Sequence, residues 1–572
     1  MPLNWLTVLI GENNAGKSNF IEAMRIAIGI GARRIEKEDI YVDVEETDPP
    51  EDREAIIDLL LRPIDNQGET ISKFPDNDYW LNLWGAGISE NDTLGEFMAI
   101  RTRLYWNKEE MRYEIERKYL KDWQHDPEKI GQSKTKEIIR FDQIEPVSLY
   151  VLDTNRDVKN DLVKTGSIWH QMVSATKFDD SDSKDIEGKI EELNQIINSN
   201  KFIVEIKEGL KELSKTFNSG SDSVALTSIP SRTRDLMDNV GINFATNGAG
   251  SFPIERHSSG TRSVASVLIF KTYIERRMKL DNERKIHPVL AIEEPETHLH
   301  PQAEDSFYRI VKNFYGQKVI STHSPRVASL SGLRDLRYFY KTGSETNIVS
   351  MENDFLLEED EHLVRRKVLK THGDIFYSRA IVLYEGEETE DQVLPLFALE
   401  YWEEEYSSLG ITMVNVNGQK YYPFLLLAKT FQIKWYIFSD GEPNTVAAVE
   451  NAVNKIGTKI VSPNIVILPD GKSFEKYISS NEYKEVLKEM IVNVKSKNEY
   501  HKRALEAECE KWTLDDLINE LKDNKTLYAP RIAPAILSVK DEELRFPAKI
   551  RELFEKISND FGFKRRDIDH RS

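Results

Sequence analysis

Cysteine is almost absent from this sequence of 572 residues: the only one is Cys509. A single cysteine excludes an internal disulfide bond and a zinc site built from cysteines, and we expect its thiol to be inert. The sequence contains no run of 18 apolar residues, and its start has no basic segment followed by an apolar one. We therefore expect no membrane span, no secretory signal and no membrane partner, and we predict a cytoplasmic protein.

Basic residues are fewer than acidic ones, 77 against 97, and the formal net charge is -20. This balance argues against a surface that binds nucleic acid everywhere, because phosphate contacts need lysine and arginine. A basic strip on an acidic surface can still hold DNA, and a metal site built from carboxylates is itself acidic. Residues 101–121 and 564–566 are the two candidate strips. A solvated charged face is an equally good interpretation of each.

The length allows three or four domains, and 40% hydrophobic with 30% charged residues suits soluble globular domains. Near the start, an apolar strand at residues 6–10 precedes a glycine-containing loop and a helix that is apolar on one face. Residues 53–62 indicate another strand, whereas residues 121–145 have no clear pattern. Apolar residues recur at steps of three and four over residues 182–217, which predicts a helical pair that serves either as core or as a dimer contact.

The last third of the chain alternates short apolar runs with helical segments. The apolar runs lie at residues 380–384, 411–416, 435–438 and 464–468. This alternation is typical of a parallel sheet covered by helices on both faces. The charged segment that precedes it, residues 350–370, indicates a connector between domains. The sequence therefore predicts an α/β domain after the connector.

The loop after the first strand has the pattern of a phosphate-binding P-loop. It reads Gly-Glu-Asn-Asn-Ala-Gly-Lys-Ser and lies between a strand and a helix, as this motif requires. Backbone N–H groups of such a loop surround phosphates at the positive end of the helix. We predict that Lys17 reaches the outer phosphates of ATP and that Ser18 ligates its magnesium ion, beside Gly11, Asn14 and Gly16.

Three downstream elements favour an ATPase of the ABC class. The apolar strand at residues 289–292 ends in Glu293 and Glu294, which resembles a Walker B strand. In that role Glu293 holds magnesium through water, and Glu294 polarises the attacking water. Alone, such a strand is better read as one capped by exposed acids, but the P-loop changes the balance. Ser259 and Gly260 lie in a segment that resembles the signature loop, and His323 resembles the switch histidine that senses the γ-phosphate.

The order of these four motifs resembles that of ABC ATPases. Because a signature loop acts on the ATP of an opposing subunit, the resemblance implies a homodimer or a higher homo-oligomer. It also implies a strand pair near the adenine, whereas only five residues precede the strand at residues 6–10.

Acidic residues follow two strands of the predicted second sheet. Glu385 and Glu390 come after the strand at residues 380–384, and Asp440 and Glu442 come after the strand at residues 435–438. Functional groups gather outside the carboxyl ends of parallel strands. Magnesium prefers oxygen ligands, and two ions about 4 Å apart can stabilise both the attacking and the leaving oxygen of a phosphodiester. Either cluster alone is better read as a solvated turn, but their order and separation resemble a TOPRIM domain.

Together, these motifs resemble the OLD (overcoming lysogenization defect) family, in which an ATPase precedes a TOPRIM nuclease. The resemblance implies that Glu475 joins the metal site and that Lys525, which Arg531 could assist, neutralises charge on the phosphate in the transition state. The family usually spaces the first two acids four residues apart, but position 389 is threonine here. Glu390 is the predicted second ligand, with Glu388 and Asp391 as alternatives.

The predicted architecture is multidomain α/β. Residues 1–155 and 241–345 form the two parts of an ABC-type P-loop ATPase, separated by a helical insertion at residues 156–240 that is the predicted dimer contact. Residues 346–375 form the connector. Residues 376–572 form a Rossmann-like TOPRIM domain with a C-terminal helical region.

The resemblance implies an ATP-binding, magnesium-dependent DNA endonuclease or nickase in anti-phage defence. It would use two magnesium ions at the nuclease site, with manganese as an alternative, and one with ATP. A helicase, as in the Gabija system, or a retron is the implied partner besides DNA. The alternative is a non-nucleolytic, ATP-driven dimer or sensor that docks a helicase or another partner. A chromosome-maintenance ATPase is disfavoured because the helical insertion is too short for an extended coiled coil.

Overall fold

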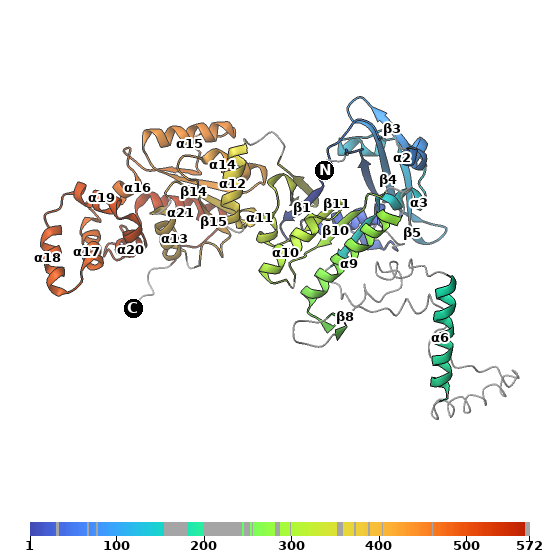
Figure 1. Cartoon of the computed structure of the whole chain (residues 1–572). Coiled ribbons are helices and arrows are strands. Elements are labelled where there is room, and N and C mark those ends of the chain that lie inside the picture. Colours follow the sequence, from blue (N-terminus) through green and yellow to red (C-terminus); the bar gives the residue numbers. More distant parts are fainter. Residues whose placement is uncertain are drawn as a thin grey trace, which may run out of the picture. The chain divides into compact units, whose positions relative to one another are not determined.

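The computed structural model describes residues 1–29, 34–65, 68–75, 78–153, 180–199, 243–244, 252–253, 256–280, 286–297, 299–351, 358–370, 373–386, 389–402, 404–459 and 462–566. Contacts divide the chain into two compact units. One comprises Met1–Thr7 and Lys17–Thr322, and the other comprises Val8–Gly16 and His323–Ser572. Each unit is described by itself (Figure 1). The predicted bounds at residues 155, 240, 345 and 375 stay predictions.

A six-stranded sheet has the order β13-β12-β1-β11-β10-β7. In the first unit, β10 pairs in parallel with both β7 and β11, and in the second β12 pairs in parallel with β1 and antiparallel with β13. Every residue of β1 and most of β10 and β11 are buried, as their apolar composition predicts. The strand bounds are β1 Leu6–Gly11, β7 Leu149–Asp153, β10 Val289–Glu293, β11 Gln317–Ser321, β12 Leu336–Thr342 and β13 Glu345–Val349.

Helices accompany these strands, as expected for an α/β fold. The helices are α1 Lys17–Ile28, α6 Asp180–Asn198, α9 Ser259–Leu280, α10 Pro301–Lys312 and α11 Pro325–Leu330. Helix α6 confirms the first helix of the predicted pair. The second predicted helix lies outside the described residues.

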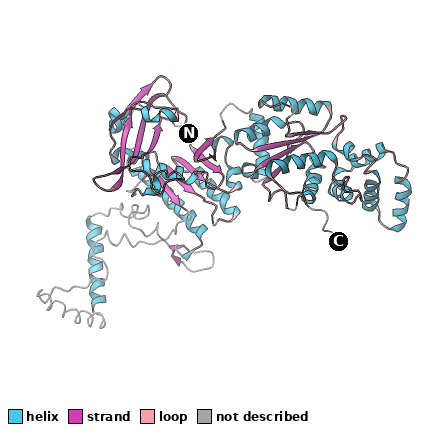
Figure 2. Ribbon diagram, turned by 180° about the vertical axis from the view of Figure 1, so that it is seen from behind, coloured by secondary structure: helices cyan, strands magenta, loops and turns pink. Residues whose placement is uncertain are grey.

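The first unit also contains an antiparallel sheet with the order β2-β4-β5-β6, and β3 pairs with β4 (Figure 2). Its strands are β2 Ala55–Leu61, β3 Ile88–Asn91, β4 Gly95–Asn107, β5 Arg112–Leu120 and β6 Thr135–Ile138, with the short helices α2 Asp78–Trp84 and α3 Phe141–Ile144 nearby in sequence. Strand β2 confirms the strand predicted at residues 53–62. Strand β6 and helix α3 lie where the sequence had no clear pattern.

In the second unit, four parallel strands follow the predicted connector. Their order is β15-β14-β16-β17. Helices α12, α14 and α15 lie over one face, and α13, α20 and α21 lie over the other (Figure 1). The predicted apolar runs match the strands closely: β14 Ala380–Tyr384, β15 Ile411–Asn415, β16 Lys434–Ser439 and β17 Ile465–Ile467. The prediction of a doubly covered parallel sheet is therefore confirmed.

A single apolar core joins this sheet to the C-terminal helices. It includes Phe397 from α13, Phe438 from β16 and Phe554 from α21, all almost fully buried. The helices of this unit are α12 Glu358–Lys370, α13 Glu390–Tyr401, α14 Tyr421–Thr430, α15 Pro443–Lys455, α16 Phe474–Ile478, α17 Lys484–Lys495, α18 Glu499–Cys509, α19 Leu514–Asp523, α20 Lys525–Leu537 and α21 Ala548–Phe561. The C-terminal helices are thus one folded body with the sheet.

Two negative expectations can be compared with the described residues. Cys509 is a buried free thiol whose pKa is raised by burial, which agrees with an inert thiol. Among the helices that the structure describes, none has the length and apolar character needed to cross a bilayer.

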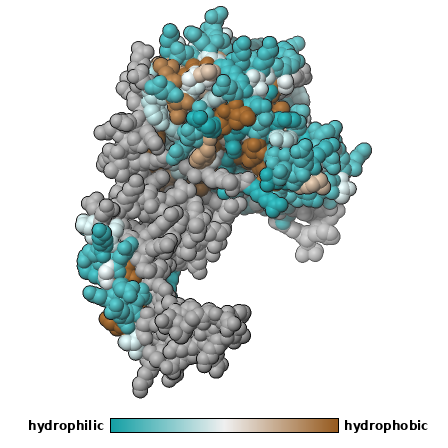
Figure 3. All heavy atoms as spheres, turned by 90° about the vertical axis from the view of Figure 1, so that its right-hand side faces the viewer, coloured by the Kyte–Doolittle hydropathy of each residue, from teal (hydrophilic) through white to brown (hydrophobic). Residues whose placement is uncertain are grey.

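The structure favours the charged-face interpretation of the strip at residues 101–121. Arg101 is buried and donates to the Asp58 carboxylate at 2.9 and 2.7 Å. Arg103 pairs with Glu54. Arg117 donates to two carbonyl oxygens at the end of α1. These cations are engaged within the protein. Figure 3 shows one face of the molecule, whose described residues are largely hydrophilic with apolar patches between them.

The tail at residues 564–566 is likewise engaged. The Arg566 guanidinium lies 3.3 Å from the Glu400 carboxylate, and the Arg565 guanidinium lies 5.6 Å from the centre of the Tyr401 ring. Both contacts fasten the tail to α13.

Arg101→Ala is expected to lower stability rather than DNA affinity. The substitution leaves the Asp58 carboxylate buried without its cation, which costs on the order of 3–5 kcal/mol. Urea denaturation measures the loss, and fluorescence anisotropy with labelled DNA measures affinity. Arg140→Ala is the control, because that side chain is 74% exposed and lies outside the strip. Unchanged stability together with weaker DNA binding would show that the strip is a DNA surface.

Candidate functional site

The P-loop has the backbone shape that phosphate binding needs. Gly11 and Gly16 have φ values of 135° and 99°, and Asn14 has a φ of 62°. A Cβ atom at Gly11 would overlap the carbonyl group of Phe339 on β12, so the close approach of these strands requires glycine. The positive φ angles therefore explain why the motif has glycine or asparagine at these three positions.

Lys17 and Ser18 are the first two residues of α1, as the strand, loop and helix prediction requires. The N-terminus of a helix presents unpaired N–H groups and a positive dipole end, which attract an anion. Lys17 is 6% exposed, whereas Ser18 is exposed. A phosphate site at this position fits both residues.

Glu293 and Glu294 lie where the Walker B resemblance places them. Glu293 is the last residue of β10 and pairs in register with Ser321 of β11. Glu294 has a φ of 43°, its N–H donates to the Ser321 carbonyl at 2.9 Å, and its carboxylate accepts from the Thr297 hydroxyl at 3.3 Å. The backbone after the strand is thus tightly bent, so the two acids leave the strand in fixed directions.

The other predicted nucleotide residues lie at element ends. Ser259 begins α9, where Gly260 is buried, and His323 follows β11 by two residues. Their roles in signature and switch stay predictions.

The acids of the second site meet at one edge of the parallel sheet. Strands β14 and β16 are neighbours, with Leu383 opposite Ile437. Glu385 follows β14 and Asp440 follows β16, so both leave the same edge of the sheet. The pKa of Asp440 is raised to about 7 by burial and by the charges of Glu385, Glu475 and Glu442. Both acids therefore lie at one edge of the sheet, and their role as metal ligands stays a prediction.

Glu390 belongs to the same cluster. It begins α13 and is 6% exposed. Burial and the Asp440 charge raise its pKa to about 8. Its carboxylate lies so close to Gly386 that a Cβ atom there would overlap it. Of the two alternatives, Asp391 instead accepts a hydrogen bond from the Tyr384 hydroxyl at 2.5 Å, and Glu388 lies outside the described residues.

Hydrogen-bond donors hold Glu385. The Tyr421 hydroxyl donates to Oε1 at 2.8 Å, and the Thr445 hydroxyl donates to Oε2 at 3.3 Å. The Asn415 amide donates to the Glu385 carbonyl oxygen at 3.0 Å. Burial still raises the pKa of Glu385 above its usual value, with the Glu442 charge acting in the same direction.

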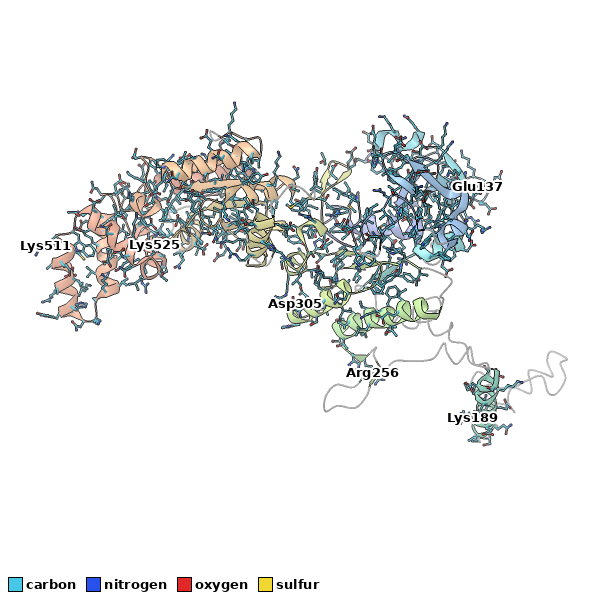
Figure 4. The ribbon with its side chains drawn as sticks, turned by 45° about the horizontal axis from the view of Figure 1, so that its top comes forward. Glu137, Lys189, Arg256, Asp305, Lys511 and Lys525 are labelled. Atoms are coloured by element: carbon cyan, nitrogen blue, oxygen red, sulfur yellow. The ribbon has the colours of Figure 1, made fainter. Side chains whose placement is uncertain are left out.

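Glu475 is compensated by a cation. Burial opposes its ionisation, but the Lys525 ammonium at 2.7 Å outweighs burial, so the Glu475 pKa is lowered. The Thr389 and Ser473 hydroxyls donate to its two oxygens at 3.2 and 3.3 Å. Lys525, labelled in Figure 4, begins α20. Thr389, which stands where the family resemblance implies an acid, therefore serves as a donor to another acid of the cluster.

The charge balance of this cluster fits a divalent cation. Five carboxylates interact there, and the Lys525 ammonium pairs with one of them, Glu475. The five are Glu385, Glu390, Asp440, Glu442 and Glu475. Two of the acids, Glu390 and Asp440, have strongly raised pKa values because they are buried and, in addition, face nearby negative charge. Among the described residues, no group of three His, Cys, Asp or Glu side chains is already arranged to hold an ion. Binding a cation would thus need side-chain rotation within the cluster.

The sequence reasoning missed the donors. These donors belong to no recognisable motif, and the sequence hints at a role only by their positions near glycine turns or helix starts. They are Tyr421, Thr445, Ser473 and Asn415. Arg531, predicted as an assistant of Lys525, is exposed and donates to the Leu527 carbonyl oxygen at 2.8 Å.

Comparisons with known families agree with this arrangement. Residues 1–328 match the family model of the AAA ATPase domain, and residues 376–441 match the overcoming lysogenization defect protein-like TOPRIM domain. The chain belongs to the AAA ATPase domain family. It joins that ATPase domain to an OLD-like TOPRIM domain, which confirms the resemblance inferred from the motifs.

Two curated relatives match parts of the chain. Endonuclease GajA from Bacillus cereus is 24% identical over 327 residues, which is 50% of this chain and 46% of that protein. The uncharacterized protein YbjD from Escherichia coli is 23% identical over 185 residues, 32% of this chain and 33% of that protein. The matched region thus spans half of these relatives or less.

Solved structures give low similarity scores. The C-terminal region of the Xanthomonas campestris OLD protein matches with a TM-score of 0.27 and 20% identity, covering 33% of this chain and 97% of that one. The SMC head domain from Thermotoga maritima matches with a TM-score of 0.27 and 14% identity, covering 62% of this chain and 92% of that one.

Because the pKa of Asp440 in the OLD-like TOPRIM domain is raised, we expect Asp440→Asn to increase the stability of the protein, by an amount that depends on pH. The pKa of this carboxyl is about 7 in the folded protein, against 3.8 for an ordinary aspartate. Its ionisation therefore lowers the stability of the folded protein as pH rises from about 4 to about 7. Asparagine removes that penalty. Without metal, we expect the melting temperature to rise by roughly 2–6 °C at pH 8 and by less at pH 5.

Differential scanning fluorimetry in EDTA at both pH values measures this gain. Asp515→Asn, on the exposed face of α19, should change neither value. An Asp440→Asn protein that is less stable than wild type at pH 8 would contradict the electrostatic account.

Proposed function

We propose that this protein is an ATP-binding, divalent-metal-dependent DNA endonuclease or nickase. The observation that carries the proposal is the set of carboxylates at the carboxyl edge of the TOPRIM sheet, with Lys525 beside them. The similarity to GajA, an endonuclease, supports the same reaction class.

The residues have distinct proposed roles. Glu385, Glu390, Asp440, Glu442 and Glu475 provide oxygen ligands for magnesium, or for manganese in its place. Divalent ions supply Lewis-acid stabilisation of the attacking and leaving oxygens of a phosphodiester. Lys525 is oriented by Glu475 at 2.7 Å, so its ammonium is placed to stabilise charge on the phosphate.

We propose that ATP binds at the P-loop with its own magnesium ion. Lys17 neutralises the outer phosphates, Ser18 and Glu293 support the ion, and Glu294 polarises water, with His323 sensing the γ-phosphate. Ser259 and Gly260 would act on the nucleotide of a second subunit, so a homodimer or higher homo-oligomer belongs to this proposal. The resemblance to the OLD family supports a role in anti-phage defence, with a helicase or a retron as partner.

Asp440→Asn is expected to abolish nicking of supercoiled plasmid in magnesium or manganese. The carboxylate lies at the centre of the cluster, and its loss removes a ligand that the neighbouring acids cannot replace. Agarose gels of supercoiled, nicked and linear DNA measure the rate, which we expect to fall at least about 100-fold. Asp515→Asn is the matched control and should cut like wild type. Equal cutting by Asp440→Asn would favour the alternative, a non-nucleolytic ATP-driven sensor.

Lys17→Ala is expected to weaken ATP binding at least about tenfold, because the ammonium at the phosphates is lost. Titration with a fluorescent ATP analogue in magnesium measures the affinity. Lys108→Ala, at a side chain 72% exposed, is the control. Asp440→Asn should bind ATP like wild type, since the nuclease acids take no part in nucleotide binding. Unchanged affinity in Lys17→Ala would place the nucleotide elsewhere.

A further inference from the structure

Glu385 is held at three of its oxygen atoms. Its two carboxylate oxygens accept from Tyr421 and Thr445, and its carbonyl oxygen accepts from Asn415. We propose that Tyr421 and Thr445 are positioning residues that preset the Glu385 carboxylate for a divalent cation. This inference rests on the proposed function of the TOPRIM site, and neither residue belongs to the acidic motifs.

Tyr421 is a rigid donor. It is the first residue of α14 and is fully buried, so its ring cannot swing away from the cluster. A neutral phenol has a single O–H to donate, and here it is directed at Oε1 of Glu385 at 2.8 Å. The buried ring therefore fixes the position of one carboxylate oxygen.

Thr445 is held in the donating orientation by a third residue. The Gln419 amide donates to the Thr445 hydroxyl oxygen at 3.0 Å. With that oxygen engaged as an acceptor, the hydroxyl proton is directed to Oε2 of Glu385 at 3.3 Å. Thr445 is 2% exposed, so water does not compete for this proton. The series Gln419, Thr445, Glu385 thus orients the second oxygen.

The carboxylate keeps capacity for a cation. An ionised carboxylate has about four lone-pair sites, and the two hydroxyls use one on each oxygen. The remaining sites point in directions that the two donors determine. Partners that orient a metal ligand in this way commonly change metal affinity or activity 10–100-fold when they are removed.

The neighbouring tyrosine provides a matched control. Tyr422 is half-buried, and the Lys455 ammonium lies 4.8 Å from its ring centre. Tyr422→Phe removes a hydroxyl from the same helix and keeps the ring that faces Lys455. It changes the same atoms as Tyr421→Phe without affecting Glu385.

Manganese binding to the nucleotide-free full chain tests the inference directly. Electron paramagnetic resonance of free Mn²⁺ gives the dissociation constant, and the binding lost in Asp440→Asn identifies the TOPRIM site. We expect Tyr421→Phe to weaken this binding about tenfold or more, and Tyr422→Phe to match wild type. Equal affinity in Tyr421→Phe and wild type, or no manganese binding at this site, overturns the inference.

Thr445 gives an independent test if Tyr421→Phe fails to fold. Thr445→Val keeps the shape without the hydroxyl and should weaken manganese binding, whereas Thr445→Ser keeps the donor and should restore it. Wild-type affinity in Thr445→Val overturns the role of Thr445. Circular dichroism checks the fold of each variant.

Plasmid nicking distinguishes a failure of the proposed nuclease function from a failure of the positioning role of Tyr421 and Thr445. A wild-type protein that binds manganese but cuts no DNA contradicts the proposed function, and the affinities of the variants still decide the inference. If wild type cuts, the manganese concentration for half-maximal nicking should rise in Tyr421→Phe and not in Tyr422→Phe. An unchanged concentration leaves the nuclease proposal standing and rejects the positioning role.

Discussion

Repulsion among desolvated carboxylates is the constraint that shapes the TOPRIM site. Parallel strands bring their carboxyl ends to one edge, so acids that follow β14 and β16 cannot avoid each other. Water that would screen their charges is largely excluded, and the pKa values of Asp440 and Glu390 rise to about 7 and about 8. Such an arrangement lowers the stability of the fold when no cation is bound. Clusters of this kind are typical of functional sites, and here the fitting function is the binding of positive charge.

The surrounding structure compensates the acids of the cluster unequally. Lys525 and two hydroxyls satisfy Glu475, and two hydroxyls hold Glu385. Lys525 is itself supplied by the C-terminal helices, where Glu520 accepts from Asn524 at 3.1 Å and from Tyr528 at 2.6 Å at the start of α20. The helical region after the sheet is therefore part of the site, since it positions the cation that fixes Glu475.

The sequence predicted those features whose signal is local in the chain. Apolar runs ending in acids gave β14 and β16, and the P-loop residues have the backbone angles that their glycines imply. Tyr421 and Thr445 could not be found in this way, because their roles depend on which helix starts reach Glu385 in the folded sheet. Position 389 is instructive: a motif comparison marks the threonine as a missing acid, whereas the structure makes it a donor to Glu475, 86 residues away.

The chain has a net charge of -20, and part of this negative charge is concentrated in the TOPRIM site. Several arginines of the strip at residues 101–121 are engaged with protein acids and carbonyl groups. In the absence of cations, the TOPRIM carboxylates would repel DNA, whereas Lys525 would attract it at close range. Two divalent ions would add four positive charges to five carboxylates and one ammonium, which brings the cluster from a formal -4 to neutrality. The ions of the proposed reaction would then also remove the repulsion between the cluster and DNA, so we expect metal binding and DNA binding at this edge to be coupled.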